Sequence, residues 1–240
     1  MAIETPATTT DAFIDDIRAS LFAWRDVPLL PIVTAVLGAV TVVTIPPHDS
    51  FPVFVLGLAF GFFSFGWFGT QFIWYKQAFD RQPIRPGELF PLTWSFIARY
   101  VRLYFVALIP LFILVFVAIR WRAFGFASPA WRIGVLVYVL VFEIAGTFIN
   151  PTLAFSTRKV TRAVPLGLRM LLRGWPGNWK YVVVPGAAVG ALGGVYWFVP
   201  YLVRPELEVL IELISLVFAG AIARYYLRNP LAPSEGALPS

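Results

Sequence analysis

Long uncharged hydrophobic stretches alternate with shorter polar segments along this chain. Six of them approach the roughly 20 apolar residues with which an α-helix crosses the hydrocarbon core of a bilayer. Helices are the expected form, because backbone groups that face lipid must be hydrogen-bonded within their own element. The pattern therefore predicts an all-α, polytopic transmembrane helix bundle of about six spans. The predicted spans are Pro28–Pro46, Phe51–Tyr75, Leu103–Ile119, Ile133–Asn150, Tyr181–Pro200 and Leu207–Tyr226.

The polar segments at the two ends of the chain complete the domain organisation. We expect residues 1–27 to form a cytoplasmic amphipathic segment, 28–226 the transmembrane domain and 227–240 a disordered cytoplasmic tail. In the first segment Asp11 can cap a helix. Its apolar stripe would consist of Phe13, Ile17, Leu21 and Trp24, with Asp15, Asp16 and Arg18 facing elsewhere. Such an acidic helix is expected to pack on basic helices of its own chain or of a partner.

The segment between the fourth and fifth predicted spans has helical periodicity with two unlike faces. At 100° per residue, one face is apolar and the other basic. Such helices lie in the membrane plane, with their charges toward anionic lipid. The pattern predicts an amphipathic interfacial helix that either binds lipid headgroups or a partner, or serves only as a topology anchor. The apolar face holds Val160, Val164, Leu168, Leu171, Leu172 and Trp175, and the basic face holds Arg158, Lys159, Arg162, Arg169 and Arg173.

The distribution of basic residues predicts the orientation. With the N-terminus in the cytoplasm, 15 of the 19 Lys and Arg residues fall in cytoplasmic segments and 4 in outer ones. Cytoplasmic loops of membrane proteins carry this excess. We therefore expect a multi-pass protein of the cytoplasmic (inner) membrane with both termini cytoplasmic. The net charge of +6 then indicates anionic lipid headgroups as partners and not nucleic acid.

One acidic residue lies well inside a predicted span. A carboxylate such as that of Glu143 costs about 2.5–3.5 kcal/mol at the centre of a membrane helix. Its expected partners are Thr70, Gln71 and Thr147, since Gly69-Thr70 and Gly146-Thr147 end two spans in a similar pattern. The site is either functional, as a proton relay, cation site or ligand contact, or a structural link between helices. Asn150-Pro151 is expected to end the fourth span, where a broken helix can expose carbonyl groups to an ion.

The remaining sequence features concern helix packing and the kinds of chemistry that the chain can carry out. G-x-x-x-G spacings predict close helix packing, within the chain or in a homo-oligomer. They occur at Gly57 and Gly61 and at Gly186, Gly190 and Gly194. The chain has no cysteine and a single histidine, His48, so a cysteine nucleophile is excluded and a histidine metal cluster is not expected. No phosphate loop, dinucleotide fingerprint or nucleophile elbow occurs. We therefore expect no catalytic residue, metal or cofactor.

Two stretches carry a family resemblance. These are Gly69–Pro86 and the run from Asn150 through Arg158 to Trp175. The chain resembles bacterial membrane proteins of the YciC type and the membrane domain fused to some glycerophosphodiester phosphodiesterases. The resemblance implies hydrophobic helices with amphipathic cytoplasmic segments and transfers no catalytic residue.

Three functions remain open at this point. The first is a non-enzymatic accessory or scaffold subunit of a larger membrane complex, or a lipid-interacting protein. The second is a small oligomeric transporter or channel that uses Glu143. The third is a membrane enzyme that acts on lipids.

Overall fold

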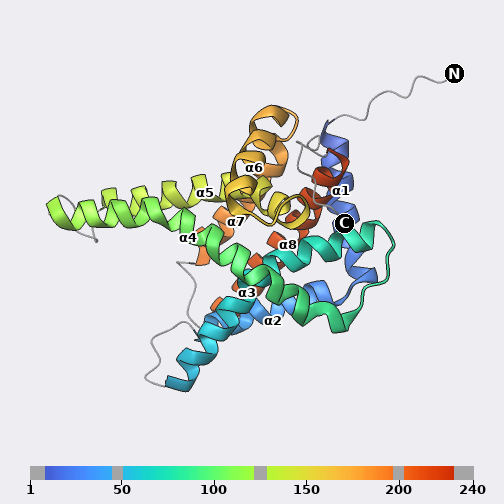
Figure 1. Ribbon diagram of the computed structural model, residues 1–240, viewed down its shortest axis with the longest axis horizontal. Coiled ribbons are helices and arrows are strands. Elements are labelled where there is room, and N and C mark those ends of the chain that lie inside the picture. The colour runs from blue at the N-terminus through green and yellow to red at the C-terminus, as the bar shows by residue number, and fades with distance from the viewer. Residues whose placement is uncertain (1–8, 45–50, 122–128, 197–202, 230–240) are drawn as a thin grey trace.

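The computed structural model describes residues 9–44, 51–121, 129–196 and 203–229 (Figure 1). Within these ranges the chain is helical and contains no strand, so the expected all-α class is confirmed for the described part. A 3₁₀ turn at Pro86–Glu88 precedes the fourth helix. The α-helices are α1 (Thr9–Asp26), α2 (Leu29–Thr44), α3 (Phe51–Phe79), α4 (Leu89–Trp121), α5 (Pro129–Phe155), α6 (Val160–Gly174), α7 (Trp179–Tyr196) and α8 (Arg204–Arg228).

Within the described residues, fewer helices are long and apolar enough to cross a membrane than the six spans that the sequence pattern predicts. Among the described residues, Val55–Phe79 and Pro86–Pro110 are long and apolar enough to cross a membrane. A third candidate arises if the bent pair α1–α2 counts as one span. The count of six is therefore not confirmed. The candidate in α4 also starts earlier than the predicted span Leu103–Ile119, because arginines within α4 lower the hydropathy without interrupting the helix.

Helix α1 turns sharply into α2, at 93°, and packs mainly on α8. Its buried side chains are Phe13, Asp16, Ser20 and Ala23, and Val27 is buried in the turn to α2. The predicted stripe was therefore wrong in part, because Leu21 is 47% exposed whereas Asp16 and Ser20 are fully buried. Small and polar residues occupy this face because α1 lies very close to α8. A Cβ at Gly220 of α8 would come within 2.1 Å of the Ser20 hydroxyl.

The core lies at one end of the molecule, here called the basic end. It comprises α1, α2, α6, the C-terminal halves of α3, α5 and α8, the N-terminal half of α4 and the first turn of α7 (Figure 1). The Tyr75 hydroxyl joins three helices there. It donates to the Leu216 carbonyl at 2.9 Å and accepts from Ser20 at 3.1 Å and from the Trp24 indole at 2.7 Å.

The other end is much less packed within the chain. In Figure 1 the outer parts of α4 and α5 project on one side, and the N-terminal part of α3 projects on another. A soluble monomer rarely exposes contiguous apolar surface of this extent, and lipid would cover it. Exposed side chains here are Phe105, Val106, Ile109, Phe112, Ile113 and Phe116 of α4, and Val137 and Val141 of α5.

The connection between α3 and α4 is short and contains no separate surface helix in the described structure. Helix α3 ends in a Schellman turn, with the Gln82 amide bonded to the Gln77 carbonyl at 2.8 Å and the Arg81 amide to the Ala78 carbonyl at 3.1 Å. Arg81 occupies the left-handed position of this turn, with φ 53°, where glycine is usual. The amphipathic residues after Pro86 are continuous with α4.

Candidate functional site

Helix α6 lies against α5 through small and apolar residues. Its buried positions are Val160, Ala163, Gly167 and Met170, which share one face of a helix. A Cβ at Gly167 would lie 2.6 Å from the Cα of Ile149 in α5, so only glycine allows this approach. The predicted apolar face is thus used largely for packing within the chain. Its far edge, at Leu172 and Trp175, is exposed.

The C-terminus of α6 is held by Asn178. This fully buried side chain donates from Nδ2 to the carbonyls of Met170 and Leu171, both at 3.1 Å. The bonds link the turn that follows α6 to carbonyl groups of the last two turns of the helix. They fix the position of the helix that carries most of the basic residues.

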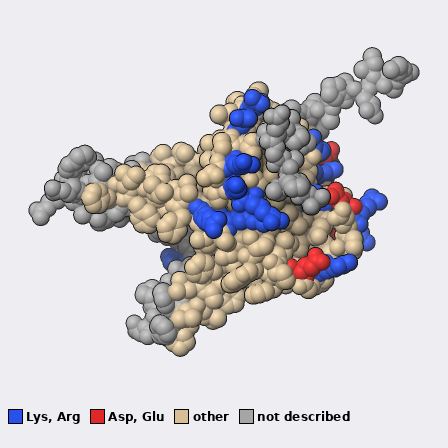
Figure 2. Space-filling view, viewed as in Figure 1, with Lys and Arg blue, Asp and Glu red and all other residues tan. Residues whose placement is uncertain are grey.

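Basic side chains cover the outer face of α6. All five predicted residues, Arg158, Lys159, Arg162, Arg169 and Arg173, are exposed. Figure 2 shows Lys and Arg gathered over α6 and the adjoining part of the bundle. Among the described residues, no Asp or Glu oxygen lies within 4.0 Å of their nitrogen atoms. This surface is positive and free to meet an anion.

A sixth basic residue joins this surface from α4, and sequence reasoning did not assign it to the site. The Arg99 guanidinium lies 4.6 Å from the centre of the Phe96 ring. Tyr100 of α4 and Val160 of α6 belong to one buried cluster, so Arg99 and Arg158, which adjoin that cluster in the sequence, lie in the same region, where their charges repel. The two arginines come together only through the packing of α4, α5 and α6, and no local sequence signal places them together. We call the set of Arg99, Arg158, Lys159, Arg162, Arg169 and Arg173 the basic patch.

The predicted polar site around Glu143 is not assembled as expected. Thr147 donates to the backbone carbonyl of Glu143 at 3.1 Å, not to its carboxylate. Thr70 bonds to the hydroxyl of Thr93 at 3.0 Å, and Gln71 is buried. In the part of the chain that the structure describes, no hydrogen bond links the Glu143 carboxylate to these residues.

The carboxylate of Glu143 has an acidic neighbour instead, Glu212. It acts electrostatically on Glu212 of α8, which also interacts with Glu208. The Glu212 side chain packs on α2, where a Cβ at Gly38 would lie 3.2 Å from its Cγ. Sequence spacing cannot find this association, since it depends on how α5 and α8 cross.

Asn150-Pro151 does not end the fourth hydrophobic helix. Helix α5 continues through Pro151 to Phe155, and the Asn150 carbonyl accepts the Tyr100 hydroxyl of α4 at 3.1 Å. The expected break with exposed carbonyl groups was therefore wrong. Proline removes one backbone donor without interrupting this helix, because α3, α4 and α6 pack around it.

The predicted glycine positions are not the close contacts within the chain. A Cβ at Gly61, Gly186 or Gly190 would meet no atom within 4 Å. Gly57 lies on α3 and is partly exposed, and the surroundings of Gly194 lie outside the described residues. The close approaches occur instead at Gly66, Gly69, Gly167 and Gly220. Spacing alone does not tell which face of a helix points inward.

A buried ionic cluster at the basic end is a second feature that sequence reasoning missed. The fully buried Asp16 carboxylate accepts the Tyr181 hydroxyl at 2.5 Å and pairs with Arg228, and with Arg224 at 3.6 Å. Burial raises the pKa of Asp16 above its ordinary value, whereas the bond from Tyr181 and the two arginines act in the opposite direction. The cluster ties α1 to α7 and α8 and thus has a structural role.

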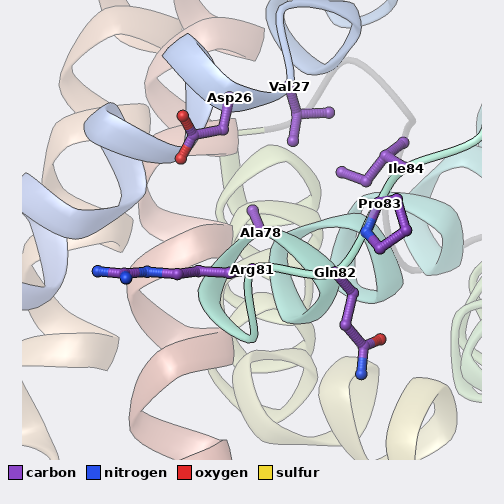
Figure 3. A pocket seen from close by; sticks show the side chains of 7 residues that line it. All are labelled: Asp26, Val27, Ala78, Arg81, Gln82, Pro83 and Ile84. Atoms are coloured by element: carbon purple, nitrogen blue, oxygen red, sulfur yellow. The ribbon is translucent and has the colours of Figure 1, made fainter.

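A cavity of about 390 Å³ lies beside the turn between α3 and α4 (Figure 3). Figure 3 shows Asp26 and Val27 above Ala78, while the side chains of Arg81 and Gln82 point away from the centre. Its lining comprises Asp26, Val27, Ala78, Arg81, Gln82, Pro83 and Ile84. No group of three or more metal-ligating side chains occurs anywhere in the described ranges.

No protein-family model, curated protein or solved structure matches this chain. The class therefore follows from the chain itself. Its described part is all-helical, with two to three helices long and apolar enough to cross a membrane, as is typical of an integral membrane protein.

Proposed function

We propose that this is a non-enzymatic integral protein of the inner membrane that binds anionic lipid headgroups at its cytoplasmic face, as an accessory or scaffold subunit. The observation that carries the proposal is the basic patch. Six cationic side chains on a rigidly held surface lack acidic partners among the described residues. Anionic lipid is the partner that such a surface meets beside a membrane.

The position of the patch supports the same proposal. It lies where α3, α5 and α8 end, next to exposed Leu172 and Trp175. Tryptophan favours the interface between headgroups and acyl chains. The excess of Lys and Arg in the segments at this end supports a cytoplasmic location, and the resemblance to YciC-type proteins supports a helical membrane protein without an assigned activity.

Lipid binding can be measured by native mass spectrometry of the purified protein with added phosphatidylglycerol or phosphatidylcholine. The wild type should retain phosphatidylglycerol preferentially. The triple variant Arg162→Gln, Arg169→Gln, Arg173→Gln should lose this preference by up to about 100-fold, at about 1 kcal/mol per basic residue. If the wild type shows no preference for the anionic lipid, the proposal is wrong.

The matched control removes three basic charges that already have acidic partners. Arg18, Lys76 and Arg85 pair with Asp15, Asp80 and Glu88 in exposed ion pairs. The control triple variant Arg18→Gln, Lys76→Gln, Arg85→Gln has the same net charge as the first variant. It should bind phosphatidylglycerol nearly as the wild type does, because lipid attraction depends on the patch and not on total charge.

A second candidate function rests on Glu143. Its carboxylate interacts with that of Glu212 from another apolar helix, and acidic groups at membrane depth are characteristic of ion or proton pathways. We propose this as the alternative, a small oligomeric transporter or channel. In proteoliposomes, proton or monovalent-cation flux that is present in the wild type and absent in Glu143→Gln would favour it over the scaffold.

A further inference from the structure

The junction of α4, α5 and α6 is a rigid framework for the two arginines that meet there. Tyr100 of α4 bonds to the Asn150 carbonyl of α5, and Gly167 of α6 lies directly on Ile149. Phe96, Tyr100, Leu103, Ile149, Leu153, Val160 and Ala163 form one buried apolar cluster. The backbone at this junction is therefore held in a defined position, and so are the points from which neighbouring side chains extend to the surface.

Arg99 is positioned by the residue beneath it. The Phe96 ring under its guanidinium lies on Gly69, where a Cβ would come within 2.3 Å of the ring. Stacking on an aromatic ring fixes the plane of a guanidinium and leaves its N–H edge free. The guanidinium is partly buried, so water screens its charge less than that of a fully exposed arginine.

Arg158 brings a second positive charge to the same place. The two charges repel, and the described part of the chain supplies no carboxylate for either. A surface that carries two arginines in one region without an acidic partner is stabilised when an anion binds beside them. Phosphate oxygens suit this geometry, because guanidinium groups bind them with two parallel hydrogen bonds.

The surface beyond Arg99 distinguishes a lipid from a free phosphate. Val106 and Ile113 follow at 7 and 14 residues, which places them on the same face of α4, about 10 and 21 Å further along. They are 50% and 60% exposed. Helix α4 has 33 residues, more than the roughly 20 that cross a bilayer core, so the part of α4 beyond Arg99 is long enough to cross by itself. A phosphate bound at Arg99 would then have an open apolar strip beneath it, where an acyl chain can lie.

We propose that Arg99 and Arg158 form a specific site for the phosphate group of an anionic phospholipid, with an acyl chain along Val106 and Ile113. This site rests on the proposed function and deepens it. It adds one discrete, phosphate-selective position to a surface that otherwise attracts anionic lipid by charge alone.

The test uses native mass spectrometry of the full chain with phosphatidylglycerol, oleate and inorganic phosphate as probes. Arg99→Gln with Arg158→Gln should weaken phosphatidylglycerol binding roughly 10- to 30-fold. Arg18→Gln with Arg85→Gln, which removes two charges from exposed ion pairs, should leave it unchanged. Arg158→Gln alone should give a smaller loss of phosphatidylglycerol binding. Because Arg158 is exposed, this variant should fold normally, and it tests the site even if the double variant folds poorly.

Selectivity provides the second measurement. Arg99→Lys with Arg158→Lys keeps both charges but lacks the paired donors of guanidinium. It should reduce the preference for phosphatidylglycerol over oleate, which carries a carboxylate. Equal preference in this variant and the wild type would overturn phosphate selectivity. Full occupancy by inorganic phosphate, with no gain from the lipid, would overturn the lipid as ligand.

The outcomes also separate this site from the broader proposal. If phosphatidylglycerol binding falls in the Arg162, Arg169, Arg173 triple variant but not in the Arg99, Arg158 variant, the lipid-binding function stands and this site is refuted. If the wild type binds no anionic lipid preferentially, both fail.

Discussion

Substituting Gly220 by alanine should strongly destabilise the fold. Gly220 lies in α8 where α1 and α3 approach it, and a Cβ there would come within 2.1 Å of the Ser20 hydroxyl and 2.6 Å of the Tyr75 ring. Overpacking of this kind costs about 1–3 kcal/mol. Displacing Tyr75 would also break at least one of its buried hydrogen bonds, at about 1 kcal/mol. The higher helix propensity of alanine offsets about 0.5–1 kcal/mol of this, so the expected net loss is about 1–3.5 kcal/mol.

The same substitution at Gly190 is the matched control. No atom lies within 4 Å of a Cβ there, so the change adds a methyl group to a helix without a clash. Alanine favours a helix over glycine by about 0.5–1 kcal/mol. Gly190→Ala should thus be neutral or slightly stabilising, and the two variants should change stability in opposite directions.

The free energy of unfolding can be measured by titrating the detergent-solubilised protein with SDS and following far-UV circular dichroism. A double variant, Ser20→Ala with Gly220→Ala, removes the hydroxyl in the closest contact and should recover part of the loss. If Gly220→Ala unfolds at the same SDS fraction as Gly190→Ala, the close packing of α1, α3 and α8 is refuted.

Three further predictions concern the basic end. Arg81→Gly should stabilise the protein by about 1 kcal/mol in chemical unfolding, because glycine adopts φ 53° without strain; a loss of stability would contradict the Schellman turn. Asn178→Leu should remove the bonds to Met170 and Leu171, cost about 1–3 kcal/mol and speed tryptic cleavage within α6, whereas unchanged cleavage would exclude this cap. Because burial raises the pKa of Asp16, its contribution to stability is complete below its ordinary acid range near pH 4 and is lost as the pH rises through the raised pKa. The melting temperature of the wild type relative to Asp16→Asn should therefore fall over that interval, and a relative rise would mean that the ion pairs outweigh burial.

The hydrophobic pattern predicted where the helices lie better than how they pack. Phe51–Tyr75 corresponds to α3. The segment between the fourth and fifth predicted spans was expected to hold an amphipathic helix because its periodicity is strong, and α6 lies there. The same reasoning placed the start of the third span at Leu103, although α4 begins at Leu89. Arginine lowers hydropathy but favours the helical backbone. The start of the apolar stretch and the start of the helix therefore differ in α4.

Which side of each helix is buried, and which residues pair, could not be predicted, because both depend on contacts between helices that are far apart in the sequence. Gly186 and Gly220 are equally small, yet only Gly220 faces another helix within the chain. Asp16 was expected on a polar face and is buried, because its partners Arg224 and Arg228 belong to the last helix. Arg99 became part of the candidate site for a similar reason, since α4 and α6 meet only in the folded bundle.

The ion pair between Asp16 and Arg228 also has a consequence for biosynthesis. The two residues are 212 positions apart, and at about 5–20 residues per second the ribosome needs roughly 10–40 s to make the intervening chain. During this time the carboxylate of α1 has no arginine partner from α8. Helix α1 can therefore reach its native position only after α8 has been synthesised, so that the first described helix of the chain is among the last to be packed in place.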